Sequence, residues 1–159
     1  MPRSSVIPNP DSNRGGPNIC FFYQDVKFSL ANRGKLKRYI QSIFKKEGKK
    51  LISINYIFCT DKALLKINRQ FLNHNFYTDI ITFDLSETSS IQGEIYISID
   101  RVKDNSKTLG TSFKSELHRV IFHGALHLCG YKDKRKVEKD KMREKEEFYL
   151  SFYQKYGST

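Results

Sequence analysis

The chain has 159 residues, enough for one domain with a hydrophobic core and too few for two such domains. Lys and Arg number 28 against 17 Asp and Glu, and the net charge of +11 fits either a polyanionic partner such as nucleic acid or a basic surface that only faces solvent. No apolar run approaches the ~18 residues of a membrane span, and the three cysteines form no CxxC pair, which argues against a disulfide framework or a thiolate zinc site.

The N-terminal residues have no hydrophobic centre like that of a signal peptide, so we expect a cytoplasmic protein without a membrane partner. They are rich in Pro, Ser, Asn and Gly and predict a flexible tail over residues 1–17, followed by a single domain over residues 18–159. That domain should open with a short strand in residues 19–26 and continue with a helix, because apolar side chains recur at helical spacing from Leu36 until Gly48.

The middle of the chain contains both β-rich and helical patterns. Residues 51–59 alternate apolar and polar side chains and predict a strand, after which Thr60 is a suitable cap for a helix that continues through Phe71. Two more strands are expected over residues 79–85 and 93–99. Because only a short Ser-rich turn separates these two strands, antiparallel pairing is the simplest arrangement.

The last third of the chain is predicted to be helical. One helix ends at Gly130 with its apolar residues on a single face, and a strongly charged helix follows from about Lys134 to Tyr156. The thin apolar stripe of the charged helix consists of Val137, Met142, Tyr149 and Phe152 or Tyr153. Together these elements predict an α+β fold, a single domain with a small mixed sheet of about four strands packed with helices.

The segment HGALHLCGYKD carries residues that suit a metal ion. His123 and His127 lie one helical turn apart, so their imidazoles can close on one ion. Gly130 can end the helix with a positive φ, and the following turn can bring Asp133 back as a third ligand. Two other arrangements fit these residues: both histidines satisfied by hydrogen bonds in a core helix, or Asp133 acting only as the cap of the next helix.

This segment differs from the HExxH helix of zinc proteases at one position. The residue after His123 is Gly124, where those proteases keep the glutamate that acts as general base. His118 lies far round the helix from the ligand face, so we expect it to be partly buried or at the surface. Glu116 is too far along the helix to be a ligand and is expected to support one or to supply charge at the helix start.

The sequence HGALHLCGY is similar to the signature HGxLHLxGYDH of the YbeY family of bacterial metal-dependent endoribonucleases, which act in ribosomal RNA maturation. The resemblance covers roughly residues 18–155 and includes further blocks at Asn68, Phe71, Thr78–Phe83, Gly93–Ser98, Glu116, Leu117 and Met142. It implies cleavage of single-stranded RNA in 16S ribosomal RNA 3′-end processing and ribosome quality control, with the small ribosomal subunit as partner. The family fold, with the metal-binding helix on one face of the sheet, agrees with the α+β prediction.

Two departures from the family pattern concern the chemistry. The family's third histidine falls on Asp133, preceded by Lys132 in place of an aspartate, and its arginine falls on Leu72. A carboxylate is an acceptable zinc ligand, so His123, His127 and Asp133 keep a three-ligand site with one position open for water. We expect one Zn²⁺ per chain, and the oxygen ligand also suits Mn²⁺ or Ni²⁺.

A metal-bound water is the expected nucleophile toward the phosphodiester, which leaves the catalytic side chains unassigned. Two catalytic candidates are Arg69, which can replace the missing arginine, and Asp79, which can orient the site. Candidates for RNA binding are Arg69, His74, Phe76 and Tyr77, the aromatic ones by stacking on bases. Simpler roles suit the same residues: a solvent-exposed arginine, a turn aspartate and a solvated loop histidine.

Three other functions fit parts of the sequence. A non-catalytic ribosome-assembly factor with a structural metal fits the leucine at position 72, where an arginine is expected. Another metal-dependent hydrolase fits the metal ligands alone, and a metalloprotease fits the helix but lacks the glutamate. The oligomeric state stays open.

Overall fold

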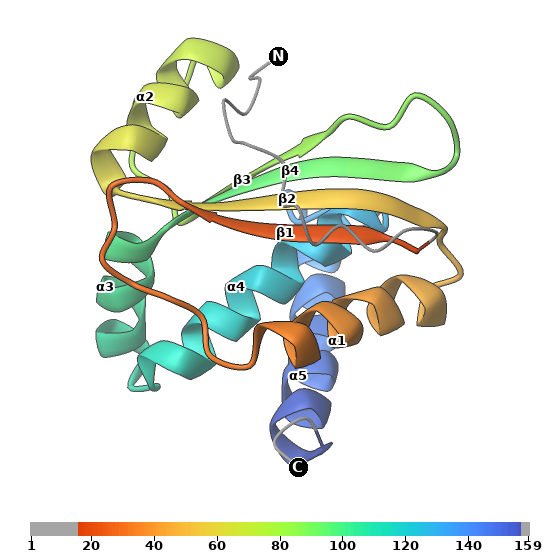
Figure 1. Ribbon diagram of the computed structural model, residues 1–159. Coiled ribbons are helices and arrows are strands. Elements are labelled where there is room, and N and C mark those ends of the chain that lie inside the picture. Colours follow the sequence, from red (N-terminus) through yellow and green to blue (C-terminus); the bar gives the residue numbers. More distant parts are fainter. Residues whose placement is uncertain (1–15, 157–159) are drawn as a thin grey trace.

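The computed structural model describes residues 16–156, so the flexible tail expected over residues 1–17 lies outside the described part except for its last two residues. Figure 1 shows the helices and strands of this part. In chain order they are β1 (Asn18–Tyr23), α1 (Arg33–Lys46), β2 (Leu51–Cys59), α2 (Asp61–Leu72), β3 (Ile80–Asp84), β4 (Ile91–Ser98), α3 (Ile99–Leu109), α4 (Phe113–Leu128) and α5 (Lys136–Tyr156). The α+β class and the single domain expected from the sequence are confirmed.

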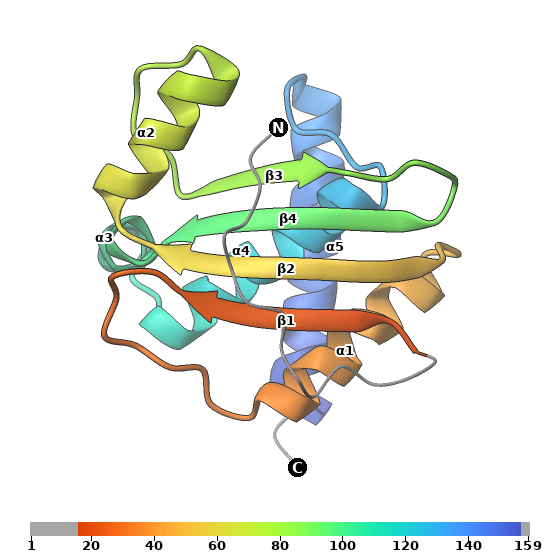
Figure 2. The ribbon, with the colours of Figure 1, turned by 45° about the horizontal axis from the view of Figure 1, so that its top comes forward.

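All four strands form one mixed sheet in the order β1-β2-β4-β3. β1 pairs in parallel with β2, and β2 pairs in parallel with β4, whereas β3 runs antiparallel to β4. Figure 2 shows that β4, the last strand in the sequence, lies between β2 and β3. The antiparallel pairing expected for the two strands of the short Ser-rich connection is therefore confirmed, with Phe83 opposite Glu94.

Helices cover the two faces of the sheet unequally. In Figure 1, α1, α4 and α5 lie on one face and α2 lies on the other, while α3 lies at one end of the sheet. The larger core lies between the sheet and the three helices and contains the fully buried Ile40, Ile95 and Ile121. Burial of each such side chain away from water contributes about 1.5–3 kcal/mol to the free energy of folding. A smaller cluster that includes Leu64 and Phe83 lies under α2.

The helix α4 has the most buried residues of any helix that the structure describes, ten of 16. Ser112 begins the helix by accepting a hydrogen bond from the backbone N–H of Ser115. At Gly124 an added Cβ would lie 2.9 Å from Ile95 Cδ1 and 3.0 Å from Ile80 Cδ1, so any other residue would have to displace these side chains. The C-terminal half of α4, which carries the two histidines, is thereby held against β3 and β4.

The helix α3 has no counterpart among the expected helices. Most of its side chains are polar, and Ile99 and Val102 are its buried apolar residues. Its ends carry clearer signals: Ser98 accepts from the backbone N–H of Arg101, and Gly110 takes a φ of 68°. Ser98 and Gly110 are therefore the sequence signals that mark the two ends of this short, mostly polar helix.

Two other details differ from the expectations. Val137, placed in the apolar stripe of α5, is 80% exposed, whereas Met142, Tyr149 and Tyr153 are buried. β1 ends at Tyr23 because Asp25 has a φ of 55°, which a strand cannot contain. The three cysteines are free, in agreement with the absence of a disulfide framework expected from the sequence, and they are buried. Within residues 16–156, no helix combines the length and apolar character needed to cross a membrane.

Candidate metal centre

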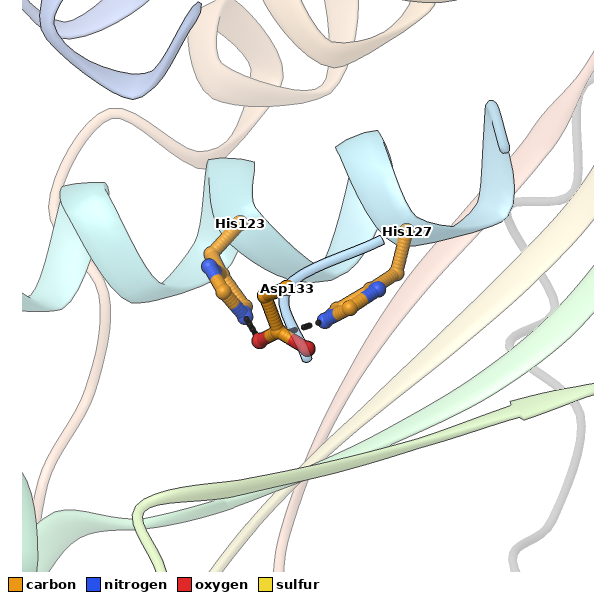
Figure 3. Close-up of side chains that lie close together, drawn as sticks. All are labelled: His123, His127 and Asp133. Atoms are coloured by element: carbon orange, nitrogen blue, oxygen red, sulfur yellow. Dashed lines mark hydrogen bonds and ion pairs between the residues drawn. The ribbon is translucent and has the colours of Figure 1, made fainter. Parts of the chain in front are cut away.

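Three side chains converge beside the C-terminal half of α4, as Figure 3 shows. Asp133 Oδ2 lies 3.3 Å from His123 Nε2 and 3.2 Å from His127 Nε2. One ligand atom from each residue lies within 4.8 Å of the other two. Two ligands at about 2.0–2.1 Å from a tetrahedral ion lie about 3.3 Å apart, so the spacing of these atoms fits one transition-metal ion.

The end of α4 brings Asp133 to the histidines. Gly130 takes a φ of 106°, its N–H donates to the carbonyl of His127, and the N–H of Tyr131 donates to the carbonyl of Leu126. These two hydrogen bonds form a Schellman motif, in which the residue with positive φ reverses the chain direction. The reversed chain then passes beside the helix face that carries the histidines, and Asp133 projects toward them.

The second nitrogen of each imidazole has its own partner. His123 Nδ1 lies 2.7 Å from Glu146 Oε2 in α5, and His127 Nδ1 lies 2.9 Å from the backbone carbonyl of Tyr131. A carbonyl only accepts, and a carboxylate accepts when ionised, so both Nδ1 atoms carry the proton. Each Nε2 faces the place between the three side chains, so that with Nδ1 protonated it is the nitrogen that would bind an ion there.

Arg119 connects this arrangement to three carboxylates. Its guanidinium donates two hydrogen bonds of 2.7 Å to Glu116 and one of 2.7 Å to Glu146, and it lies 3.8 Å from Asp79. Burial alone would raise the pKa of Glu146, but the hydrogen bond from His123 and the charge of Arg119 hold the pKa below its ordinary value. Glu146 is therefore an ionised acceptor that fixes the His123 ring. The sequence reasoning missed both Arg119 and Glu146.

A second set of contacts anchors the loop that carries Asp133. The Tyr131 hydroxyl donates to Glu47 Oε1 at 2.5 Å, the Tyr149 hydroxyl donates to Glu47 Oε2, and Lys145 Nζ lies 3.2 Å from the same oxygen. Burial raises the pKa of Glu47, but these three partners together lower the pKa below its ordinary value. The C-terminus of α1 thus holds the residue whose carbonyl orients His127.

The three converging residues line a cavity of about 640 Å³. Of the residues predicted to take part in catalysis or RNA binding, Asp79, His74 and Phe76 also line it, as does Leu72. The rings of His74 and Phe76 stack, with centroids 5.1 Å apart and an angle of 22° between their planes. The structure therefore brings an aromatic pair and the three candidate metal ligands to one cavity, of a size that holds a small ligand.

Two of the predicted residues lie elsewhere. Neither Arg69 nor Tyr77 is among the described residues that line the cavity. Arg69 Nε donates to Asn75 Oδ1 at 2.5 Å, which stabilises the loop after α2. The guanidinium carbon Cζ of Arg101 lies over the Tyr77 ring, 5.4 Å from the ring centroid. Arg69 lies in α2 and Tyr77 lies in the loop after it, and the sequence does not give the direction in which either side chain points.

Asp79, which is partly buried, and His118, which is buried, have shifted pKa values. Burial raises the pKa of Asp79 above its ordinary value, although the charge of Arg119 opposes the shift. His118 is only 5% exposed and packs between the rings of Phe122 and Tyr153. Burial and the nearby charge of Lys114 lower the pKa of His118 to about 4. His118 is more deeply buried than expected and is not part of the converging group.

Comparison with known proteins agrees with this geometry. Residues 21–154 match the family described as Endoribonuclease YbeY. The chain belongs to the YbeY endoribonuclease family. Enzymes of this family are metal-dependent nucleases that act on RNA phosphodiester bonds. The expected family membership is therefore confirmed, and the described triad is the part of the fold that suits the metal.

Individual YbeY proteins are similar over nearly their whole length. Endoribonuclease YbeY of Cytophaga hutchinsonii is 52% identical over 134 residues, which are 84% of this chain and 94% of that protein. The YbeY of Karelsulcia muelleri is 46% identical, over 84% of this chain and 95% of its own. A solution structure of a Thermotoga maritima protein matches with a TM-score of 0.59 and 28% identity, covering 88% of this chain and 92% of that one.

Proposed function

We propose that this protein binds one metal ion through His123, His127 and Asp133 and uses it to cleave single-stranded ribosomal RNA. The proposed biological role is the maturation of the 16S ribosomal RNA 3′ end and ribosome quality control, with the small ribosomal subunit as partner. Zn²⁺ is the proposed ion, and the mixed nitrogen and oxygen ligands also suit Mn²⁺ or Ni²⁺. The three buried free thiols suit the reducing cytoplasm as its location.

The observation that carries this proposal is the direction of the two imidazoles. Both Nδ1 atoms are engaged, by Glu146 and by the carbonyl of Tyr131, so both Nε2 atoms face the carboxylate of Asp133 as the nitrogens that would bind an ion. Three ligands leave a coordination position open, as in catalytic rather than structural zinc sites. When bound, a divalent ion supplies Lewis-acid stabilisation of phosphoryl oxygens and a water of lowered pKa.

The protein's own residues would bind and orient the RNA. The stacked rings of His74 and Phe76 offer a surface on which an unpaired base can stack, at the cavity that also contains the metal ligands. Such stacking contributes about 1–3 kcal/mol per base and tolerates any sequence. Bases are available for stacking only where they are unpaired, which supports a single-stranded substrate.

The same geometry argues against a protease. Position 124, where zinc proteases carry the general base, is a glycine that faces Ile80 and Ile95 of the sheet, and a side chain there would have to displace both isoleucines. A second candidate function, a non-catalytic ribosome-assembly factor, is favoured by one observation: Leu72 lines the cavity with an apolar side chain where a cation would assist phosphate binding.

The test compares metal-free protein with protein reconstituted with Zn²⁺, Mn²⁺ or Ni²⁺, using elemental analysis and a cleavage assay on single-stranded RNA. We expect about one ion per chain, loss of cleavage on metal removal and recovery on reconstitution. His123→Ala should lose both metal and cleavage, whereas His118→Phe, which keeps a ring in the aromatic cluster, should retain both. Metal-loaded protein that binds small subunits without cutting RNA would instead identify the assembly factor.

A further inference from the structure

The cavity beside the triad has an unusual balance of charge for a site that receives RNA. Three carboxylates line it, those of Asp79, Asp84 and Asp133. Among the described residues that line the cavity, permanent positive charge comes only from Arg119 and Lys134. Asp133 would offset one of the two charges of a divalent ion, and the other two acids repel a phosphodiester, so a further cation that is not already neutralised would favour its binding beside the metal.

Arg119 cannot supply that charge. Its guanidinium donates hydrogen bonds of 2.7 Å to Glu116 and Glu146, whose side chains are 2% and 8% exposed, and lies 3.8 Å from Asp79. These carboxylates use its donors and offset its charge. Turning Arg119 toward a phosphate would leave the buried Glu116 without an ion-pair partner and Glu146 with His123 alone, which costs several kcal/mol.

Unlike Arg119, Lys134 has an ammonium group whose hydrogen-bond donors are not used, and whose charge is not offset by a carboxylate, within residues 16–156. It is exposed, and it forms no ion pair or hydrogen bond with any residue in the described part of the chain. It follows Asp133 directly, so its backbone position is fixed by the loop that the Schellman motif and the Glu47 contacts hold. An ammonium on a flexible stem is well suited to follow a phosphate on a mobile single strand.

We propose that Lys134 binds the phosphate of the RNA strand next to the metal and thereby replaces the cation that Leu72 does not provide. The inference rests on the proposed function, since it assigns a substrate contact within that same site. Lys134 holds the phosphate, and the residue before it holds the metal, so one short loop sets the distance between the two. Arg69, the cation expected from the sequence, is replaced in this role because it lies outside the cavity lining.

The experiment compares Lys134→Ala with the matched control Lys136→Ala, which removes an exposed lysine two residues further on that does not line the cavity. Binding is measured with a labelled single-stranded oligonucleotide of 2′-O-methyl ribose, whose integrity is checked on a gel, at several salt concentrations. We expect Lys134→Ala to weaken binding about tenfold and to reduce the slope of log affinity against log salt by about 0.7, the value for one phosphate contact. Lys134→Arg should keep the slope, and metal content should not change.

Cleavage of ordinary RNA then separates the two levels of the proposal. If the wild-type protein cleaves RNA and Lys134→Ala matches Lys136→Ala in rate, affinity and salt slope, the assignment of Lys134 is overturned while the nuclease function stands. Equal losses in both variants would also overturn it, because they would indicate only a general effect of charge. If the wild-type protein binds the oligonucleotide without cleaving RNA, the proposed nuclease function is wrong. The binding data for Lys134→Ala and Lys136→Ala then decide whether Lys134 contacts the phosphate.

Discussion

The carboxylate of Asp133 sets the charge of the candidate metal centre. Two neutral imidazoles leave the charge of a divalent ion unchanged, whereas a carboxylate reduces it by one and makes the ion a weaker Lewis acid. Asp133 lies 3.2–3.3 Å from both Nε2 atoms, while the N–H of Arg135 at the start of α5 donates to Glu138. The contacts therefore favour a metal-ligand role for Asp133 over a helix cap.

Replacing Asp133 tests this role at the level of one residue. We expect Asp133→Ala to weaken metal affinity at least about a hundredfold, because a site worth about 10–16 kcal/mol with four ligands loses a few kcal/mol with each one. Asp133→His should restore the affinity, and its nitrogen ligand should shift the preference from Mn²⁺ toward Zn²⁺. Isothermal titration of metal-free protein measures both effects.

Asp140→Ala is the control, since Asp140 is an exposed carboxylate on α5. An Asp133→Ala protein with the affinity of the wild type would show that the aspartate does not hold the metal.

At the scale of elements, three separate segments build the site. α4 supplies the histidines, the loop after it supplies Asp133, and α5 supplies Glu146. The charged sequence of α5 predicts a solvated helix, and most of its charges are indeed exposed. Glu146, however, is 6% exposed and faces α4, where it bridges His123 and Arg119. The packing of α5 on α4 thus determines the orientation of a proposed metal ligand.

Glu146→Gln tests the contribution of α5. The glutamine keeps the shape of the side chain but removes the charge that accepts from His123 Nδ1 and pairs with Arg119. Loss of a partner that orients a ligand lowers metal affinity by about 10- to 100-fold, and we expect a decrease in this range. Titration with Zn²⁺ in a competing chelator gives the measurement. The neighbouring Glu147→Gln, which changes an exposed side chain, should bind as the wild type does; equal affinities in both variants would contradict the role of Glu146.

At the scale of the whole molecule, the free energy of unfolding should depend on pH through His118. The unfolded chain protonates this residue near pH 6.5, whereas the folded protein does so only near pH 4. Between these values the unfolded state binds more protons, so the stability falls as the pH decreases from 6.5 to 4 and is unaffected by this group below that range. The difference between the pKa values of His118 in the unfolded and folded states corresponds to about 3 kcal/mol in the free energy of unfolding.

His118→Phe removes this part of the pH dependence and retains a ring against Phe122 and Tyr153. Denaturant unfolding of metal-free protein at pH 7 and pH 4 should show a loss of stability that is about 2–3 kcal/mol smaller in the variant. Use of metal-free protein keeps metal release from adding to the change. Equal losses would mean that His118 becomes charged in the folded protein at little cost.

The sequence by itself determined the parts of this protein that depend on neighbouring residues. Helical spacing placed His123 and His127 on one face, and Gly130 with Asp133 predicted the return of the chain, because all four lie within one short segment. Alternation and turn residues located all four strands. These signals are local, since they report the burial and backbone conformation of a segment, and the α+β class follows from their order.

Only the tertiary structure decided which distant groups meet. Glu146 lies 23 residues from His123, and Glu47 lies 84 residues from Tyr131. Nothing in the sequence around either glutamate distinguishes it from the other charged residues of its helix. Likewise, the loop after α2 brings His74 into the cavity lining but leaves Arg69 out of it, and Lys134 lines the cavity as a cation without a partner in the described chain. Such outcomes depend on how helices and loops pack in three dimensions. The residue type gives the charge of a side chain but not the direction in which the side chain points after packing.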